Sequence, residues 1–180
     1  MMGLGDDSVH ISRIRKSRGQ GFERDLVKRY RAAGWWSYRT GGNSAYLPDV
    51  MATNDSTGEL DVVEAKAGAK DHLYVEWDQI ERDIFLINGF KLYPKRRIVL
   101  AFKFLSKKRK GDGYLRRELR EFYKLVPEEL WDSLRGQTIC CHYERGNDLP
   151  DYSPPFKIKG KKGKGAVQEG SEEGDEIGEE

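Results

Sequence analysis

Apolar residues near the start of the chain recur at helical spacing and end at a glycine. The positions are Phe22, Leu26, Val27, Tyr30 and Ala33, followed by Gly34. This pattern predicts an amphipathic helix over residues 18–33, after Ser17 and Gln20 at capping-box spacing. A second stripe, with the same period, predicts a helix over residues 76–88; its members are Trp77, Ile80, Ile84 and Ile87.

Short apolar segments separated by turn residues predict β-strands. In residues 60–66, Leu60, Val62, Glu64 and Lys66 alternate with the remaining side chains and therefore share one face. Residues 98–104 are almost continuously apolar, which is typical of a strand covered on both faces. The other expected elements are strands at 35–39, 46–53 and 121–126 (an edge strand), a basic loop at 107–113 and a short helix at 127–134. The order of elements favours an α/β fold: a central mixed β-sheet flanked by helices.

Composition divides the chain into three parts. Residues 1–17 are polar and basic and are expected to form a flexible arm, and residues 18–145 carry the apolar patterns of one domain. Residues 146–180 are rich in Pro, Gly and Lys, then in acids, which predicts a disordered tail.

The net charge of +2 conceals an uneven distribution. Residues 166–180 contain seven acids and no base, so residues 1–165 carry about +9. A folded body of this sign suggests an acidic partner such as nucleic acid, although surplus lysine also serves solubility.

The sequence argues against several classes of protein. No apolar run approaches the length of a membrane helix, and the first residues lack the pattern of a secretory signal. Cys140 and Cys141 are adjacent, which fits neither a zinc motif nor a disulfide framework. We therefore expect a cytoplasmic protein without a membrane partner.

Charged residues on the third predicted strand need an explanation. Glu64 and Lys66 share a face beside Val62 and Val63, and Asp49 follows Pro48 on the preceding strand. The turn at residues 54–58 would place these strands side by side. Two neighbouring carboxylates repel each other, and Mg²⁺ would remove that penalty. The alternative is an exposed hairpin with a Glu–Lys pair on its solvent face.

The order of several motifs resembles the archaeal Holliday-junction resolvase family. The motifs are Phe22-Glu23-Arg24, Tyr38-Arg39-Thr40-Gly41-Gly42, Pro48-Asp49-Val50, Val63-Glu64-Ala65-Lys66, Lys70-Asp71-His72-Leu73-Tyr74-Val75 and Val99-Leu100-Ala101-Phe102-Lys103-Phe104. The similarity spans about residues 15–105. The family belongs to the Pro-Asp/Glu-x-Lys nuclease superfamily, so the resemblance implies a restriction-endonuclease-like core.

The resemblance also implies a function and a site. The expected activity is a Mg²⁺-dependent DNA endonuclease that resolves four-way junctions in recombination and repair, with Mn²⁺ as a substitute ion. The implied roles are Asp49 and Glu64 as metal ligands, Glu23 as the residue completing the acidic site, Lys66 as the catalytic lysine, Arg39 as an arginine needed for cleavage and Ser44 as a loop serine assisting it. The alternatives are a related nuclease acting on duplex DNA and a non-catalytic junction-binding module, and the complete set of acids and lysine argues against the latter.

Two symmetric nicks require two active sites, which predicts a homodimer. Phe85, Leu86 and Phe90 are not all on the apolar stripe of their helix and are the expected interface. DNA is expected to contact Arg15, Lys16, Arg18, Arg24 and Arg39. The chain shows no sliding-clamp motif to support a clamp partner.

Overall fold

The computed structural model describes residues 19–40, 46–111 and 113–159. In this part of the chain, five strands form a central sheet in the order β1-β2-β3-β5-β8. The strands are β1 (Trp36–Arg39), β2 (Val50–Asn54), β3 (Glu59–Gly68), β5 (Lys95–Phe104) and β8 (Arg120–Leu125). The β3–β5 pair is parallel and the other pairs are antiparallel. The predicted mixed sheet, with the segment around residues 121–126 at its edge, is confirmed.

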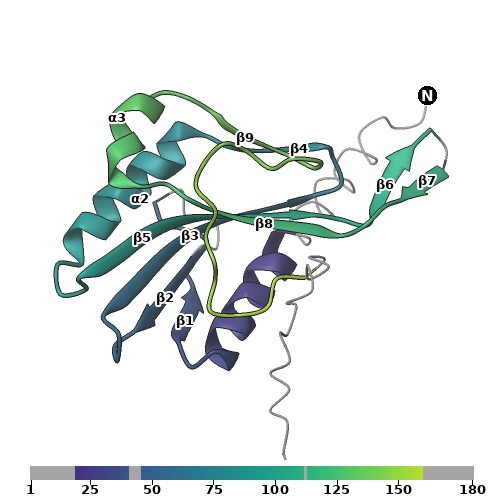
Figure 1. The fold of residues 1–180 in the computed structure, drawn as a ribbon. Coiled ribbons are helices and arrows are strands. Elements are labelled where there is room, and N and C mark those ends of the chain that lie inside the picture. The colour runs from purple at the N-terminus through teal and green to yellow at the C-terminus, as the bar shows by residue number, and fades with distance from the viewer. Residues whose placement is uncertain (1–18, 41–45, 112, 160–180) are drawn as a thin grey trace, which may run out of the picture.

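Helices cover both faces of this sheet (Figure 1). A helix at residues 19–32 packs on one face, and α2 (Trp77–Gly89) packs on the other. Alternate residues of β3 point into the two layers, with Val62 on the α2 side and Val63 on the side of the first helix. β5 contributes to both layers in the same way, which explains its nearly continuous apolar sequence.

Smaller elements extend the α2 side and one end of the sheet. β4 (His72–Val75) pairs with β9 (Ile139–His142), and β6 (Lys107–Lys110) pairs with β7 (Gly113–Arg116). The short helical segment expected near residue 130 is the 3₁₀ turn η1 (Glu128–Leu130) followed by α3 (Trp131–Leu134). The expectation of a loop at residues 107–113 is wrong, because Gly111, with φ +55°, allows the basic segment to turn back as a hairpin.

The expected strand over residues 46–53 begins later, at Val50. Pro48 has no N–H to give to a ladder. Next to it, the Asp49 carboxylate accepts a hydrogen bond from the Ala65 N–H at 2.8 Å, at the place where a strand partner would otherwise do so. Asp49 therefore lies directly before β2, and its side chain is hydrogen-bonded to the backbone of β3.

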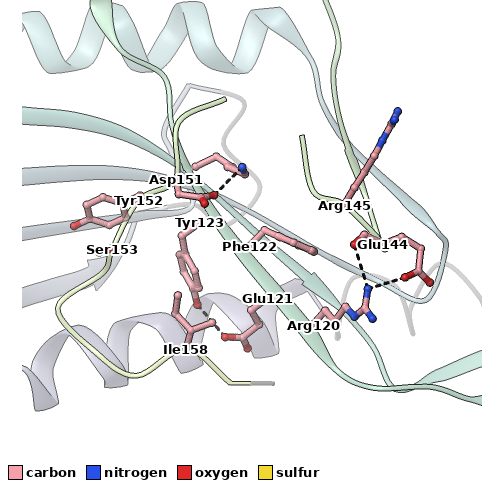
Figure 2. A pocket seen from close by; sticks show the side chains of 11 residues that line it. Arg120, Glu121, Phe122, Tyr123, Glu144, Arg145, Asp151, Tyr152, Ser153 and Ile158 are labelled. Atoms are coloured by element: carbon pink, nitrogen blue, oxygen red, sulfur yellow. Dashed lines mark hydrogen bonds and ion pairs between the residues drawn. The ribbon is translucent and has the colours of Figure 1, made fainter. Parts of the chain in front are cut away.

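The folded part continues beyond residue 145, where we expected a tail to begin. Figure 2 shows Asp151, Tyr152 and Ile158 beside Tyr123 and Glu121 of β8. The Tyr152 N–H donates to the Tyr123 carbonyl at 2.8 Å, and the Tyr152 side chain is buried. Aromatic anchors thus hold residues 146–159 on the sheet in spite of their polar composition.

The arm expected at residues 1–17 and the remainder of the expected tail, residues 160–180, lie outside the described residues. Within the described ranges, no helix has the length and apolar character needed to cross a membrane.

Candidate active site

The entrance of β2 and the second half of β3 bring the predicted strand residues together. The Asp49 carboxylate bonds to the backbone of β3 between Glu64 and Lys66. The Lys66 Nζ lies 3.4 Å from Glu64 Oε2. Glu64 is almost fully buried, with 1% of its surface exposed. The alternative of a solvent-exposed Glu–Lys pair therefore disagrees with the structure.

The first helix and β1 add two further predicted residues to the same place. Arg39 Nε donates to Glu23 Oε2 at 2.6 Å. Burial raises the pKa of Glu23, the charge of Asp49 raises it further, and Arg39 and Lys66 oppose the rise. The charges of Asp49, Arg39 and Lys66 thus all affect the pKa of Glu23, as expected if the four residues share one site.

Helix α2 supplies residues that the sequence interpretation missed. Arg82 Nη2 donates to Glu64 Oε1 and, at 3.1 Å, to Asp83 Oδ1, and Gln79 Nε2 lies 3.3 Å from Glu64 Oε2. Asp83 is fully buried, and its Oδ2 has no hydrogen-bond partner among the described residues. Burial, together with the nearby charge of Asp49, raises the pKa of Asp83 to about 7 against the opposing effects of Arg82 and Lys66.

A signal for Asp83 is present in the sequence. It lies three residues after Ile80 and four before Ile87, so it occupies the apolar stripe of α2, where an acid is costly. Arg82 and Gln79 carry no comparable signal, because charged and amide side chains are ordinary beside such a stripe.

Two of the acids, Glu23 and Glu64, are paired with cations. Among the described residues, no three His, Cys, Asp or Glu side chains lie close enough to hold a metal ion as they stand. Glu23 is paired with Arg39, and Glu64 with Lys66 and Arg82. The residues nevertheless fit a hard divalent cation in chemistry and charge, because their donors are carboxylates and Asp83 keeps an unpartnered buried oxygen.

The other predicted site residues are distributed differently. Arg24 is exposed on the first helix beside Glu23. Ser44, Arg15, Lys16 and Arg18 lie outside the described residues.

The predicted interface residues differ in their exposure. Phe85 is 84% exposed. Leu86 of α2 and Phe90, which directly follows α2, are partly buried and pack against the core of their own chain. The interface at Phe85, Leu86 and Phe90 stays a prediction, and Phe85 is its most exposed member.

Comparison with known proteins identifies the family. A family model described as archaeal Holliday junction resolvase (Hjc) matches residues 14–107, more than half of the chain. No curated protein matches significantly. A 1.6 Å structure of Hjc from Archaeoglobus fulgidus, a Holliday junction resolvase from an archaeal hyperthermophile, is 24% identical and has a TM-score of 0.40, over 64% of this chain and 88% of that chain.

The family match agrees with the motifs that carry the resemblance and with the restriction-endonuclease-like core that they imply. It covers Glu23, Arg39, Asp49, Glu64 and Lys66, the residues that the fold brings together. The chain therefore belongs to the archaeal Holliday junction resolvase family and is a DNA endonuclease.

Proposed function

We propose that the protein resolves four-way DNA junctions with Mg²⁺, by paired symmetric nicks made by a homodimer. The observation that carries the proposal is the convergence of Glu23, Asp49, Glu64 and Lys66 from the first helix and two neighbouring strands. Membership of the family supports junction DNA as the substrate and a divalent metal ion as the cofactor.

Asp49 and Glu64 are the residues that would hold the ion, with Glu23 beside them. Carboxylate oxygens are hard ligands, which favours Mg²⁺, with Mn²⁺ as a substitute. When bound, such an ion supplies a Lewis acid for the phosphate oxygen and lowers the pKa of a bound water.

The chain's own cations have separate roles in this proposal. The Lys66 ammonium, 25% exposed at its side chain, is available to stabilise negative charge that builds up on the phosphate. Arg39 holds the Glu23 carboxylate at 2.6 Å, and Arg82 and Gln79 hold that of Glu64. Because these contacts restrain both acids, Arg39, Arg82 and Gln79 are positioning residues.

DNA binding would involve the exposed Arg24, beside Glu23 on the first helix, and Arg39 at the site. Arg15, Lys16, Arg18 and Ser44 are proposed from the sequence alone. A sliding-clamp partner has no motif to support it.

The proposal is tested with a synthetic four-way junction and a linear duplex of matched sequence, each incubated with and without Mg²⁺. We expect junction cleavage that requires the ion, and its loss in Asp49→Asn and Glu64→Gln with junction binding retained. Lys66→Met should lower the rate about 100- to 1,000-fold, as removal of an electrostatic transition-state contact does.

Asp132→Asn is the matched control, because Asp132 of α3 is 95% exposed at its side chain and contacts Arg135, which directly follows α3. It should cleave at the wild-type rate. Equal cleavage of duplex and junction would favour the duplex nuclease, and junction binding without cleavage would favour the binding module.

A further inference from the structure

The β6–β7 hairpin extends away from the central sheet (Figure 1). In its ladder, Lys107 pairs with Arg116 and Lys108 with Leu115. Directly opposed residues of an antiparallel pair share a face, so these two pairs belong to opposite faces of the hairpin. Lys108 and Leu115 face the body, where they line a cavity of about 580 Å³ with His72. We call the other face, with Lys107, Tyr114 and Arg116, the outer face.

The outer face carries charge that the described part of the chain does not neutralise. Lys107 and Arg116 are exposed, and neither forms an ion pair with another described residue. Like charges directly opposite each other destabilise a hairpin, so this pair favours an anionic partner. The Tyr114 ring is 71% exposed beside them. A cationic ridge with an aromatic ring is the combination that binds phosphates and stacks on bases.

The base of the hairpin is fixed to the strand that carries the site. Arg117 donates to Asp71 at 2.6 Å, to the Leu105 carbonyl at 3.0 Å and to the Ala69 carbonyl at 2.9 Å, and Lys108 also pairs with Asp71. Ala69 directly follows β3, which bears Glu64 and Lys66. The hairpin is therefore held in a defined position relative to the acidic site.

The separation between hairpin and site suits one DNA substrate. Phe102 is the ladder partner of Lys66, and Lys107 follows Phe102 by five residues. Five residues of fully extended chain span at most roughly 18 Å, which limits the distance from Phe102 to the start of the hairpin. This is less than one turn of duplex, about 34 Å. The match to the family model ends at residue 107, so all of the hairpin except its first residue, Lys107, lies beyond the part of the chain that the family model covers.

We propose that the outer face of the β6–β7 hairpin binds the branch point of the junction, a role that rests on the proposed function. Lys107 and Arg116 contact backbone phosphates, and Tyr114 stacks on a base pair that has lost a stacking neighbour at the crossover. Between its ends, a continuous duplex offers no such open base face, so Tyr114 distinguishes a branch point from uninterrupted duplex, whereas the two cations bind both.

The test measures the affinity of the full chain for a four-way junction and a matched duplex, without divalent ions. Tyr114→Ala should weaken junction binding about 5- to 150-fold, the range for loss of one stacked base, and leave duplex binding unchanged. Tyr114→Phe should restore binding. Leu92→Ala is the control, because Leu92 is 95% exposed and lies outside the hairpin.

A second readout follows the stacking directly. 2-Aminopurine placed at the crossover should change its fluorescence on binding wild-type protein but not Tyr114→Ala. The double variant Lys107→Gln/Arg116→Gln should make the affinity for both DNAs less dependent on salt. The slope of log affinity against log salt should become less negative by about 0.9 for each lost phosphate contact. Arg135→Gln, an exposed cation of the α3 region, should leave the slope unchanged.

The results separate the two proposals. Equal junction affinities for wild type and Tyr114→Ala would overturn the role of the hairpin, whether or not the protein cleaves junctions. An equal loss on duplex would overturn its selectivity. Tyr114-dependent junction binding by a wild-type protein that cleaves no junction would uphold the hairpin and overturn the proposed function.

Discussion

At the scale of single residues, Asp83 is the most unusual group of the described chain. It is fully buried on α2, and one carboxylate oxygen lacks a partner among the described residues. Arg82 bonds to the other oxygen and also to Glu64. Asp83 therefore lies in the core and is linked to Glu64 of the candidate site through Arg82. An ionised carboxylate at such a buried position costs free energy.

We predict that Asp83→Asn makes folding stability less dependent on pH. The pKa of Asp83 rises from its ordinary 3.8 to about 7 in the folded protein, so its contribution to stability is complete below about pH 4 and is lost as the pH rises through 7. The variant avoids this loss. It should be more stable than wild type at pH 8, on the order of 1–4 kcal/mol, with the difference shrinking toward pH 4.

Urea unfolding between pH 4 and 8.5, in the presence of a chelator, measures this difference. Asp78→Asn, an exposed acid in the first turn of the same helix, is the control. A difference between Asp83→Asn and wild type that stays constant with pH would contradict the assigned pKa.

At the scale of elements, residues 146–159 act as a strap across the sheet. The hydroxyls of Tyr152 and Tyr30 both donate to Asp61 Oδ2, and Arg97 Nε donates to Asp61 Oδ1 at 2.7 Å. Phe156 packs edge-on against the Tyr30 ring, with centroids 5.0 Å apart. The strap thus completes the hydrogen bonding of a buried carboxylate on β3, the strand that also carries Glu64.

We predict that the strap is part of the folding unit. Truncation after Arg145 removes the buried Tyr152 and the partly buried Phe156 and should destabilise the protein by roughly 1.5–3 kcal/mol or more, the contribution of one fully buried aromatic side chain. Truncation after Lys159 keeps every described contact and is the matched control. Chemical denaturation of the two proteins compares them, and equal midpoints would show that the strap is dispensable.

A point substitution isolates the polar part of the same contact. Tyr152→Phe retains the ring and removes one hydrogen bond to the Asp61 carboxylate, so it should cost roughly 1.5–3 kcal/mol in the same measurement. An unchanged free energy of unfolding would mean that Tyr30 and Arg97 satisfy Asp61 without help.

At the scale of the whole molecule, the number of active sites determines how many strands can be cut at one time. The described part of each chain places Glu23, Asp49, Glu64 and Lys66 around one site. The paired nicks of the proposed function would therefore require two chains related by a two-fold axis. Phe85 is the predicted interface residue that presents its ring to solvent.

We predict that Phe85→Glu yields folded monomers. Each Phe buried at an interface contributes roughly 1.5–3 kcal/mol, so loss of two per dimer should weaken association by about 100-fold or more. Sedimentation velocity measures the state, and a cruciform plasmid should give nicked circles in place of linear product. Phe85→Tyr should remain dimeric, and a dimeric Phe85→Glu would place the interface elsewhere.

Local pattern determined much of the candidate site. Alternation along a strand assigns Glu64 and Lys66 to one face whatever surrounds them, because side chains of a strand alternate with period two. The Pro48-Asp49 pair likewise places an acid next to the following strand, although the start of that strand at Val50 instead of residue 46 was not predicted. The two layers of apolar positions in residues 98–104 and the amphipathic first helix are local patterns of the same kind, and the α/β fold follows from them.

Tertiary structure decided which groups meet. Arg82 reaches Glu64 across a helix–sheet contact, Tyr152 reaches Asp61 across 91 residues, and Leu86 packs against the core. Periodicity states which face of an element is buried but not what buries it, because the partner depends on packing between distant segments. The sequence motifs therefore identified the acids and the lysine of the candidate site. The contact of Arg82 with Glu64, the burial of Asp83 and the position of the basic hairpin became known only from the tertiary structure.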